Sequence, residues 1–322
     1  MKLIATPENP IPPGAIVSQA RAIDGAQLRA ARWVPTTAKR GTVTILQGRA
    51  EFIEKYFEVA GELLARGFAV AAIDWRGQGG SQRQLKNPHK GHIDDFSFYE
   101  RDLSALVDDV LGPSCPQPWF GLAHSMGGAI MLGIARAGRC PFERLVLTSP
   151  MVGLVGQRLP WLNRFVVETL DTLGFGGAFA PGGGSTSYSV KPFAGNVLTS
   201  DQRRYARTAR VLETAPELAL GGATIGWLNA AMRAMAEFEA PEFAREIATP
   251  TLVLASGADR VVDTEATERF ASRLRTGRLI VIDGAEHEVM VEQDRYRDLF
   301  WAAFDQFIPG VEGEIFRKRA SV

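Results

Sequence analysis

The sequence lacks the excess of charge of one sign, the many cysteines and the long apolar runs that are typical of nucleic-acid-binding, disulfide-rich and membrane-spanning proteins. Positive and negative charges balance, with 36 lysines and arginines against 36 aspartates and glutamates, so no overall field attracts the chain to nucleic acid. Only two cysteines occur, Cys115 and Cys140, which is typical of a reducing compartment. These features favour a cytoplasmic protein without a nucleic-acid partner.

Long apolar runs are also lacking. Nowhere do eighteen apolar residues stand together, as a membrane-spanning helix requires. The residues after Met1 soon reach four prolines and include no apolar stretch of signal-peptide length. The basic end at Arg317 to Arg319 is more typical of a solvated terminus than of an anchor. What remains, with 46% hydrophobic and 22% charged residues, is the composition of a globular enzyme with a large core.

Short apolar runs alternate with helical patterns along most of the chain. The runs are rich in β-branched residues and apolar on both faces, which is typical of parallel strands covered by helices. The pattern predicts an α/β protein with a mostly parallel central sheet, helices on both faces and an N-terminal hairpin. The predicted strands are 16–22, 28–33, 42–46, 69–73, 119–123, 145–148, 251–255 and 279–282, and the clearest helices are 52–66 and 96–111.

The alternation stops between residues 151 and 239. This stretch holds a glycine-rich run at 174–184 and helical patterns at 201–212 and 225–235, and a long interruption of this kind is usually a functional insertion. We predict that residues 1–150 and 240–322 form the core domain and that 151–239 form an inserted helical lid. A packed helical extension without a role at the site is the alternative.

The segment 119–130 runs from a predicted strand directly into a predicted helix, with Ser125 at the turn. A serine projected from such a turn adopts strained backbone angles, which crowd the residues two before and two after it. Both are small here, Ala123 and Gly127, so the segment differs from the common G-x-S-x-G motif by one methyl group. We predict that Ser125 is a nucleophile. The alternative is a serine that merely caps a helix.

His287 is the predicted base for this serine. It is the only histidine after Ser125 in a chain of four, and it follows the last predicted strand, at the sheet edge where α/β proteins bind ligands. Asp259 follows the preceding strand and is the predicted acid, which would orient the imidazole. Asp263 is the alternative acid, although its position favours capping of a helix that begins near Thr264.

Acyl transfer also needs hydrogen-bond donors for an oxyanion. The backbone amide of Met126, directly after the nucleophile, is one predicted donor. The amide of Arg49 is the other, because it lies in the loop after the strand at 42–46, where Gly48 permits a tight turn. A simple strand-to-helix turn is the alternative for this loop.

These motifs resemble the lysophospholipase and monoacylglycerol lipase branch of the α/β-hydrolases, also labelled serine aminopeptidase-like, and the bacterial lysophospholipases in particular. The chain departs from the branch at Ala123, where glycine is usual, and at Gln47, where histidine is usual. The second departure raises the question of how the oxyanion loop is held. The matching blocks are 47–51 with Lys55 and Tyr56, 74–81, the serine turn, the Asp259 and His287 loops, 196–201 and 221–227.

The motifs and the resemblance together predict a serine hydrolase that cleaves carboxylic esters of single-acyl, lipid-like substrates without a metal or organic cofactor. Trp161 and Phe165 are predicted to contact the acyl chain, although an apolar stripe is equally typical of a core. The resemblance also leaves open a peripheral contact with the inner membrane. The stripe consists of Leu154, Val155, Leu159, Trp161, Leu162, Phe165, Val166 and Leu170.

Two other classes of function stay open. A peptidase or amidase on the same three residues would need an anchor for a charged substrate terminus, and Glu51 is the predicted anchor unless it is merely a helix N-terminal carboxylate. A non-catalytic binding protein on a hydrolase scaffold would require a broken triad, and all three members are present.

Overall fold

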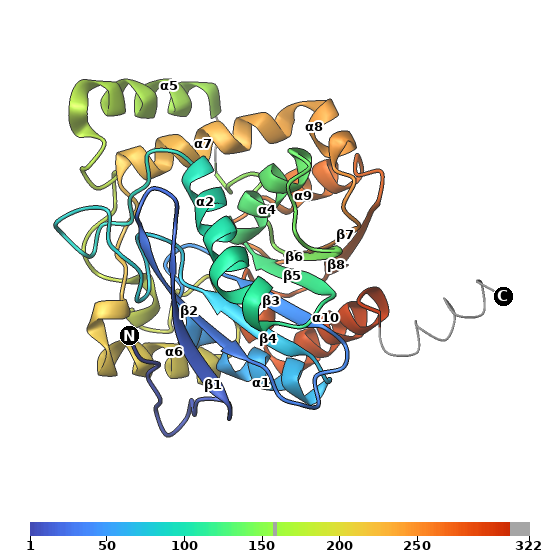
Figure 1. Cartoon of the computed structure of the whole chain (residues 1–322). Coiled ribbons are helices and arrows are strands. Elements are labelled where there is room, and N and C mark those ends of the chain that lie inside the picture. Colours follow the sequence, from blue (N-terminus) through green and yellow to red (C-terminus); the bar gives the residue numbers. More distant parts are fainter. Residues whose placement is uncertain (157–159, 310–322) are drawn as a thin grey trace.

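The computed structural model describes residues 1–156 and 160–309 and contains one eight-stranded sheet (Figure 1). The strand order is β1-β2-β4-β3-β5-β6-β7-β8. The first two strands pair antiparallel, and β2 is antiparallel to β4, whereas β3 to β8 are parallel. The strands are β1 (Ala15–Arg21), β2 (Gln27–Trp33), β3 (Thr42–Leu46), β4 (Ala69–Ile73), β5 (Trp119–His124), β6 (Arg144–Thr148), β7 (Thr251–Ser256) and β8 (Gly277–Ile282).

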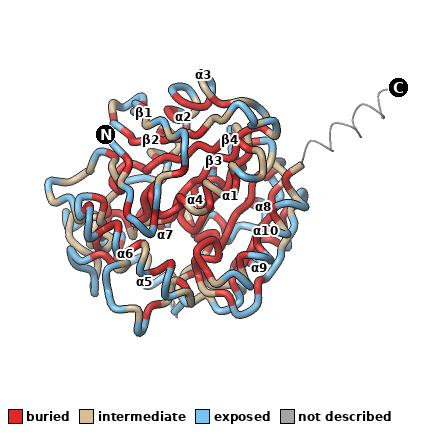
Figure 2. The backbone as a smooth tube through the Cα atoms, turned by 90° about the horizontal axis from the view of Figure 1, so that it is seen from below, coloured by how far each residue is buried: buried red, intermediate tan, exposed pale blue. Residues whose placement is uncertain are grey.

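The inner strands are buried on both faces because their side chains alternate between two apolar layers. In β6, Leu145 and Leu147 belong to one core cluster and Val146 belongs to the other. The same alternation holds in β7, where Val253 faces the first cluster and Leu252 the second. Figure 2 shows buried residues gathered along the strands at the centre of the molecule. The predicted class, an α/β sheet covered on both faces, is confirmed.

The helices divide between the two faces of the sheet (Figure 1). Apolar side chains of α1 and α10 pack in one cluster, and those of α2, α4, α7 and α8 pack in the other. The predicted helix at 52–66 begins as a 3-10 turn and continues as α1, and the helix at 96–111 is α2 followed by a π-helical segment. The helical elements are η1 (Ile53–Tyr56), α1 (Phe57–Ala65), α2 (Ser97–Leu106), η2 (Val107–Leu111), α3 (Gly112–Ser114), α4 (Met126–Arg136), α5 (Pro160–Leu170), η3 (Asp171–Phe175), η4 (Tyr188–Val190), α6 (Gln202–Thr214), η5 (Pro216–Leu218), α7 (Ile225–Glu239), α8 (Pro241–Glu246), α9 (Thr264–Ala271), η6 (Val289–Val291) and α10 (Asp294–Phe307).

The segment 151–239 has two different parts. Helix α7 lies inside the molecule, because Ile225, Trp227 and Phe238 belong to the same apolar cluster as the sheet. Helix α5 lies on top of α7 at the surface (Figure 1), and most of its residues are exposed. This segment therefore shares the core of the α/β domain mainly through α7, while α5 contributes only Val167 and the partly buried Leu170 to that cluster. Leu159 and the basic end at 317–319 lie outside the described residues.

No helix within residues 1–156 and 160–309 combines the length and the apolar character that crossing a bilayer would require.

Candidate active site

Ser125 stands at a sharp turn between β5 and α4. Its φ of 49° and ψ of −113° place this non-glycine residue in the positive-φ region, which is costly and is maintained only where the surroundings impose it. A Cβ added at Gly127 would lie 2.3 Å from the carbonyl oxygen of Leu46. Only glycine at that position therefore lets the start of α4 approach the end of β3, which brings the Met126 amide toward the loop after that strand.

Three side chains from three loops form a hydrogen-bonded row at this turn. Ser125 Oγ lies 3.0 Å from His287 Nε2, and His287 Nδ1 lies 2.8 Å from Asp259 Oδ2. All three side chains are buried, and their loops follow β5, β7 and β8 at the carboxyl edge of the sheet. Asp263 instead caps α9, where its Oδ1 accepts from the amide of Ala266 at 3.0 Å. The structure thus brings together the three residues predicted as the triad and places the alternative acid elsewhere.

Asp259 is held as a carboxylate. Burial alone would raise its pKa, but hydrogen bonds from His287 and from the amides of Val261 and Val262 outweigh burial and keep the pKa of Asp259 below its usual value. An ionised carboxylate can only accept, so His287 Nδ1 carries the hydrogen that it donates to Asp259. With this hydrogen on Nδ1, the neutral form of the ring would present an unprotonated Nε2 to the hydroxyl of Ser125, as a general base requires.

The loop after β3 is held by side chains from the loop after β4. Gln78 Nε2 donates to the carbonyls of Gly48 at 2.8 Å and Glu51 at 3.2 Å, while its Oε1 accepts from the amide of Ala50 at 3.1 Å. Trp75 Nε1 donates to the carbonyl of Gln47 at 3.0 Å. These contacts fix the predicted oxyanion loop, in which Ala50 has a φ of 62°. These contacts show how the loop is held although Gln47 replaces the usual histidine. Gln78 was not singled out from the sequence.

Glu51 is not a free anchor for a charged substrate, contrary to the prediction. Its Oε2 accepts from the amide of Gly48 at 2.5 Å and from the hydroxyl of Tyr56 at 2.7 Å, and its Oε1 accepts from Lys55 Nζ at 2.8 Å. Despite burial, the charge of Lys55 lowers the pKa of Glu51 to about 2. Because both oxygens have internal partners and the side chain is buried, Glu51 supports the loop that is predicted to bind the oxyanion.

Lys55 connects this loop to the loop that carries His287. Its ammonium also lies 2.5 Å from Glu288 Oε1, and Glu288 follows His287 directly. The exposed fraction of these three charged side chains is at most 9%. Glu51, His124 and Glu288 hold potential metal-ligand atoms within 4.8 Å of one another, but the Lys55 ammonium already pairs with both carboxylates, so we assign no metal to the cluster.

The insertion reaches the His287 loop through residues 196–201. The amide of Glu288 donates to the carbonyl of Leu198 at 2.8 Å, and Ser200 Oγ donates to Glu292 Oε2 at 2.6 Å. Thr199 Oγ1 donates to the carbonyl of Val291 at 2.9 Å. This half of the insertion is therefore part of the support of the His287 loop.

Comparisons with known proteins agree with this site. The sequence model of the family described as "Serine aminopeptidase, S33" (Hydrolase_4) matches residues 37–294. The chain belongs to the serine aminopeptidase S33 family. Lysophospholipase L2 of Escherichia coli (strain K12) is 36% identical over 277 residues, which are 82% of this chain and 79% of that protein. Probable lysophospholipase L2 of Haemophilus influenzae is 30% identical over 263 residues, 82% of each chain.

A solved structure of a soluble variant of monoglyceride lipase from Saccharomyces cerevisiae, in complex with a substrate analog, superposes with a TM-score of 0.72. The two sequences are 19% identical, and the superposed region covers 91% of this chain and 95% of the yeast chain. This likeness shows the fold, and the family match adds the branch. The predicted α/β-hydrolase of the lysophospholipase and monoacylglycerol lipase branch is confirmed, as is the class of ester hydrolase.

Trp161 and Phe165 lie at the surface in this member of the S33 family. Each is 63% exposed, on the surface helix α5. Leu162 and Val166 on the same helix are also exposed, as are Leu173 and Phe175 in the turn that follows. The structure therefore gathers these side chains on one exposed apolar helix, and their contact with a bound acyl chain stays a prediction.

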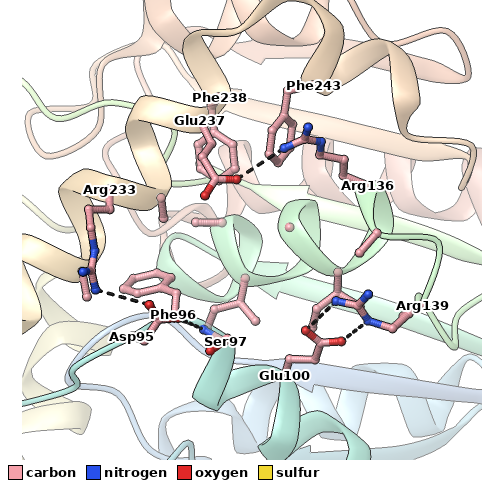
Figure 3. A pocket seen from close by; sticks show the side chains of 17 residues that line it. Asp95, Phe96, Ser97, Glu100, Arg136, Arg139, Arg233, Glu237, Phe238 and Phe243 are labelled. Atoms are coloured by element: carbon pink, nitrogen blue, oxygen red, sulfur yellow. Dashed lines mark hydrogen bonds and ion pairs between the residues drawn. The ribbon is translucent and has the colours of Figure 1, made fainter.

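A groove of about 570 Å³ opens between α2, α4 and α7, away from the triad (Figure 3). Its floor is apolar, and three arginines stand at its rim. Each of them is paired: Arg233 with Asp95, Arg136 with Glu237 and Glu246, and Arg139 with Glu100. None of the lining residues is Ser125, Asp259 or His287.

Proposed function

We propose that this protein hydrolyses carboxylic esters of single-acyl lipids, with Ser125 as nucleophile, His287 as general base and acid, and Asp259 as the orienting carboxylate. The hydrogen-bonded row of these three side chains at the strained turn supports the proposal. The names of the E. coli and H. influenzae relatives, both lysophospholipases, support the choice of substrate class.

The reaction proceeds in two acyl-transfer steps. His287 Nε2 takes the hydroxyl proton of Ser125 as Oγ attacks the ester carbonyl, and the charge on the former carbonyl oxygen is stabilised by the amides of Arg49 and Met126. The alcohol then leaves with the proton from His287. Water, deprotonated by the same imidazole, attacks the acyl-enzyme and releases the fatty acid.

The exposed apolar side chains of α5 support contact with aggregated substrate. A soluble monomer rarely leaves so many large apolar side chains unpacked on one helix, and such patches usually mark an interaction surface. A helix with this face lies well in the headgroup region of a lipid layer. Under this proposal, segment 151–239 acts as a lid whose helix α5 contacts the lipid surface, and the protein associates peripherally with the membrane.

Amide or peptide hydrolysis is the weaker candidate. A peptidase of this kind would need a free carboxylate for the substrate amine, and Glu51 is occupied by Gly48, Lys55 and Tyr56.

The proposal is tested by Ser125→Ala, assayed with a nitrophenyl ester, an aminoacyl arylamide and a fluorophosphonate label. The wild type should turn over the ester far faster than the arylamide. The variant should lose ester turnover and labelling while keeping its unfolding midpoint. Stoichiometric labelling of another serine would refute the assignment of Ser125, and a preference for the arylamide would refute the ester proposal.

A further inference from the structure

Arg49 carries a cation without a carboxylate partner at the predicted oxyanion loop. Among the described residues, the one hydrogen bond of its side chain runs from Nη2 to the carbonyl of Gly221 at 2.9 Å, and its Nε is buried without any partner. The guanidinium also lies over the ring of Trp227, 5.0 Å from the centroid. Burial lowers the pKa of Arg49 to about 10, because no nearby acid compensates for it.

Among the described residues, the four arginines with buried side chains all have carboxylate partners, whereas Arg49, like the partly buried Arg83, has none. Arg29 pairs with Glu54 and Asp74, and Arg76 pairs with Asp24 and Asp102. Arg204 and Arg297 also pair with carboxylates. The three rim arginines of the groove in Figure 3, which are more exposed, are paired as well. A buried cation without a counter-charge is costly, so its retention in the predicted oxyanion loop points to a bound anion in the working state.

The surroundings keep the guanidinium in place and leave donors free. A Cβ added at Gly91 would lie 2.5 Å from Arg49 Nη2, so a larger residue there would push the guanidinium out of its present position. One of five N–H donors meets the Gly221 carbonyl, and residue 49 keeps intermediate exposure. The guanidinium therefore lies between the oxyanion loop and the insertion, with donors to spare.

We propose that the side chain of Arg49 binds the phosphodiester of a lysophospholipid whose ester carbonyl lies at Ser125. This inference rests on the proposed function and names the residue that reads the head group. The phosphate of a lysophospholipid lies one glycerol unit from the ester carbonyl, and the Arg49 guanidinium lies one side-chain length from its own backbone amide. One residue can thus contact the oxyanion with its main chain and the phosphate with its side chain.

Arginine suits this task better than lysine. Its planar fork can donate two parallel hydrogen bonds to phosphate oxygens, and it loses less hydration than an ammonium when it is buried. A monoacylglycerol lacks the phosphate and gains nothing from this contact. Arg49 is therefore expected to set the preference between the two substrates.

The test compares a lysophosphatidylglycerol and a monoacylglycerol with the same acyl chain, both below the concentrations at which they form micelles. The measured quantity is the ratio of their kcat/KM values in wild type, Arg49→Lys and Arg49→Gln. The ratio should fall by about ten- to a hundredfold in Arg49→Gln, as expected when a hydrogen bond to a charged group is lost. The loss should appear mainly in KM for the lysophospholipid, and Arg49→Lys should lie between the other two.

Arg83→Gln is the matched control. Like Arg49, Arg83 has no carboxylate within salt-bridge distance among the described residues. Its Nη2 also donates to a carbonyl of segment 151–239, that of Glu217, at 2.7 Å. Its replacement should leave the ratio unchanged. An equal slowing of both substrates by Arg49→Gln, or an equal fall of the ratio in Arg83→Gln, would overturn the role of Arg49 and leave the ester hydrolase intact. A wild type inactive on both substrates would instead overturn the proposed function.

Discussion

The imidazole ring of His124 lies 4.8 Å from that of His287, measured between ring centroids. His124 is buried, and its Nδ1 lies 3.1 Å from the carbonyl oxygen of Thr148. Burial lowers the pKa of His124 to about 4, so the ring is neutral at neutral pH. A neutral neighbour would not repel the imidazolium that the proposed mechanism forms on His287, whereas a second cation at this distance would.

This depressed pKa predicts how His124 affects stability in acid. Below pH 6.5 the unfolded chain protonates this histidine while the folded chain does not until about pH 4. The contribution of His124 to stability is therefore fully present above pH 6.5, and it falls as pH drops toward 4, by about 1.4 kcal/mol per pH unit at most. Urea unfolding of the wild type and His124→Asn measures this contribution as the difference between the two curves. A difference that stays constant from pH 7 to pH 4.5 would contradict the assignment.

Asp259→Asn should lower kcat by several orders of magnitude. The amide would favour the wrong tautomer of His287, and the comparable change in a serine protease costs about 10⁴. Asp263→Asn is the matched control, since asparagine caps a helix about as well as aspartate. It should leave kcat within a small factor of the wild type. Steady-state kinetics on one ester compares the two, and the reverse ranking would move the acid to Asp263.

Lys55→Met should destabilise the fold and slow hydrolysis. It leaves Glu51 and Glu288 buried without their shared cation, which costs about 3–5 kcal/mol in comparable pairs, and it frees the oxyanion loop from the His287 loop. Adding Glu288→Gln to Lys55→Met removes one stranded charge and should recover part of the unfolding free energy. Urea unfolding measures both variants. A double variant no more stable than Lys55→Met would show that charge burial is not the cause.

Replacing Trp161 and Phe165 with alanine should impair the use of aggregated lipid selectively. Both side chains are largely exposed, so the unfolding free energy should change by less than about 0.5 kcal/mol. Activity on long-chain monoacylglycerol in vesicles should fall, while turnover of a soluble acetyl ester should be nearly unchanged. Leu299→Ala, which removes an apolar side chain that is 54% exposed on α10, is the control. Equal loss on both substrates would indicate a role of α5 in the fold.

Local patterns predicted the strands and the three triad side chains because both depend on short segments. In the sequence, the two strands β3 and β4 stand out as apolar runs because both of their faces are buried. Each begins and ends at the predicted residues. Ser125, Asp259 and His287 each follow a strand, so the parallel order of the sheet brings them to one edge. Their positions along the chain therefore predicted that the three side chains would meet, and the structure places them within hydrogen-bond distance of one another.

Contacts between distant segments were not predictable in the same way. Gln78 and Glu288 look like ordinary polar loop residues, and only the fold reveals that one holds the oxyanion loop and the other pairs with Lys55. Glu51 was misread for a different reason: its three internal partner atoms come from the nearby residues Gly48, Lys55 and Tyr56, and the sequence does not show that this short loop turns all three toward one carboxylate. The spacing of apolar residues in α5 predicted a helix face but not the side of the molecule on which it lies.

The hydrogen bonds between residues 196–201 and the His287 loop limit how the insertion can be exchanged. A graft of a foreign cap over the whole of 151–239 would remove the groups that meet Glu288 and Glu292, and the imidazole would lose its alignment even with every triad residue unchanged. A shorter graft that ends before Asn196 would spare those contacts. For protein engineering, we therefore expect that an exchange can replace residues before Asn196, whereas residues 196–201 have to be kept together with the His287 loop.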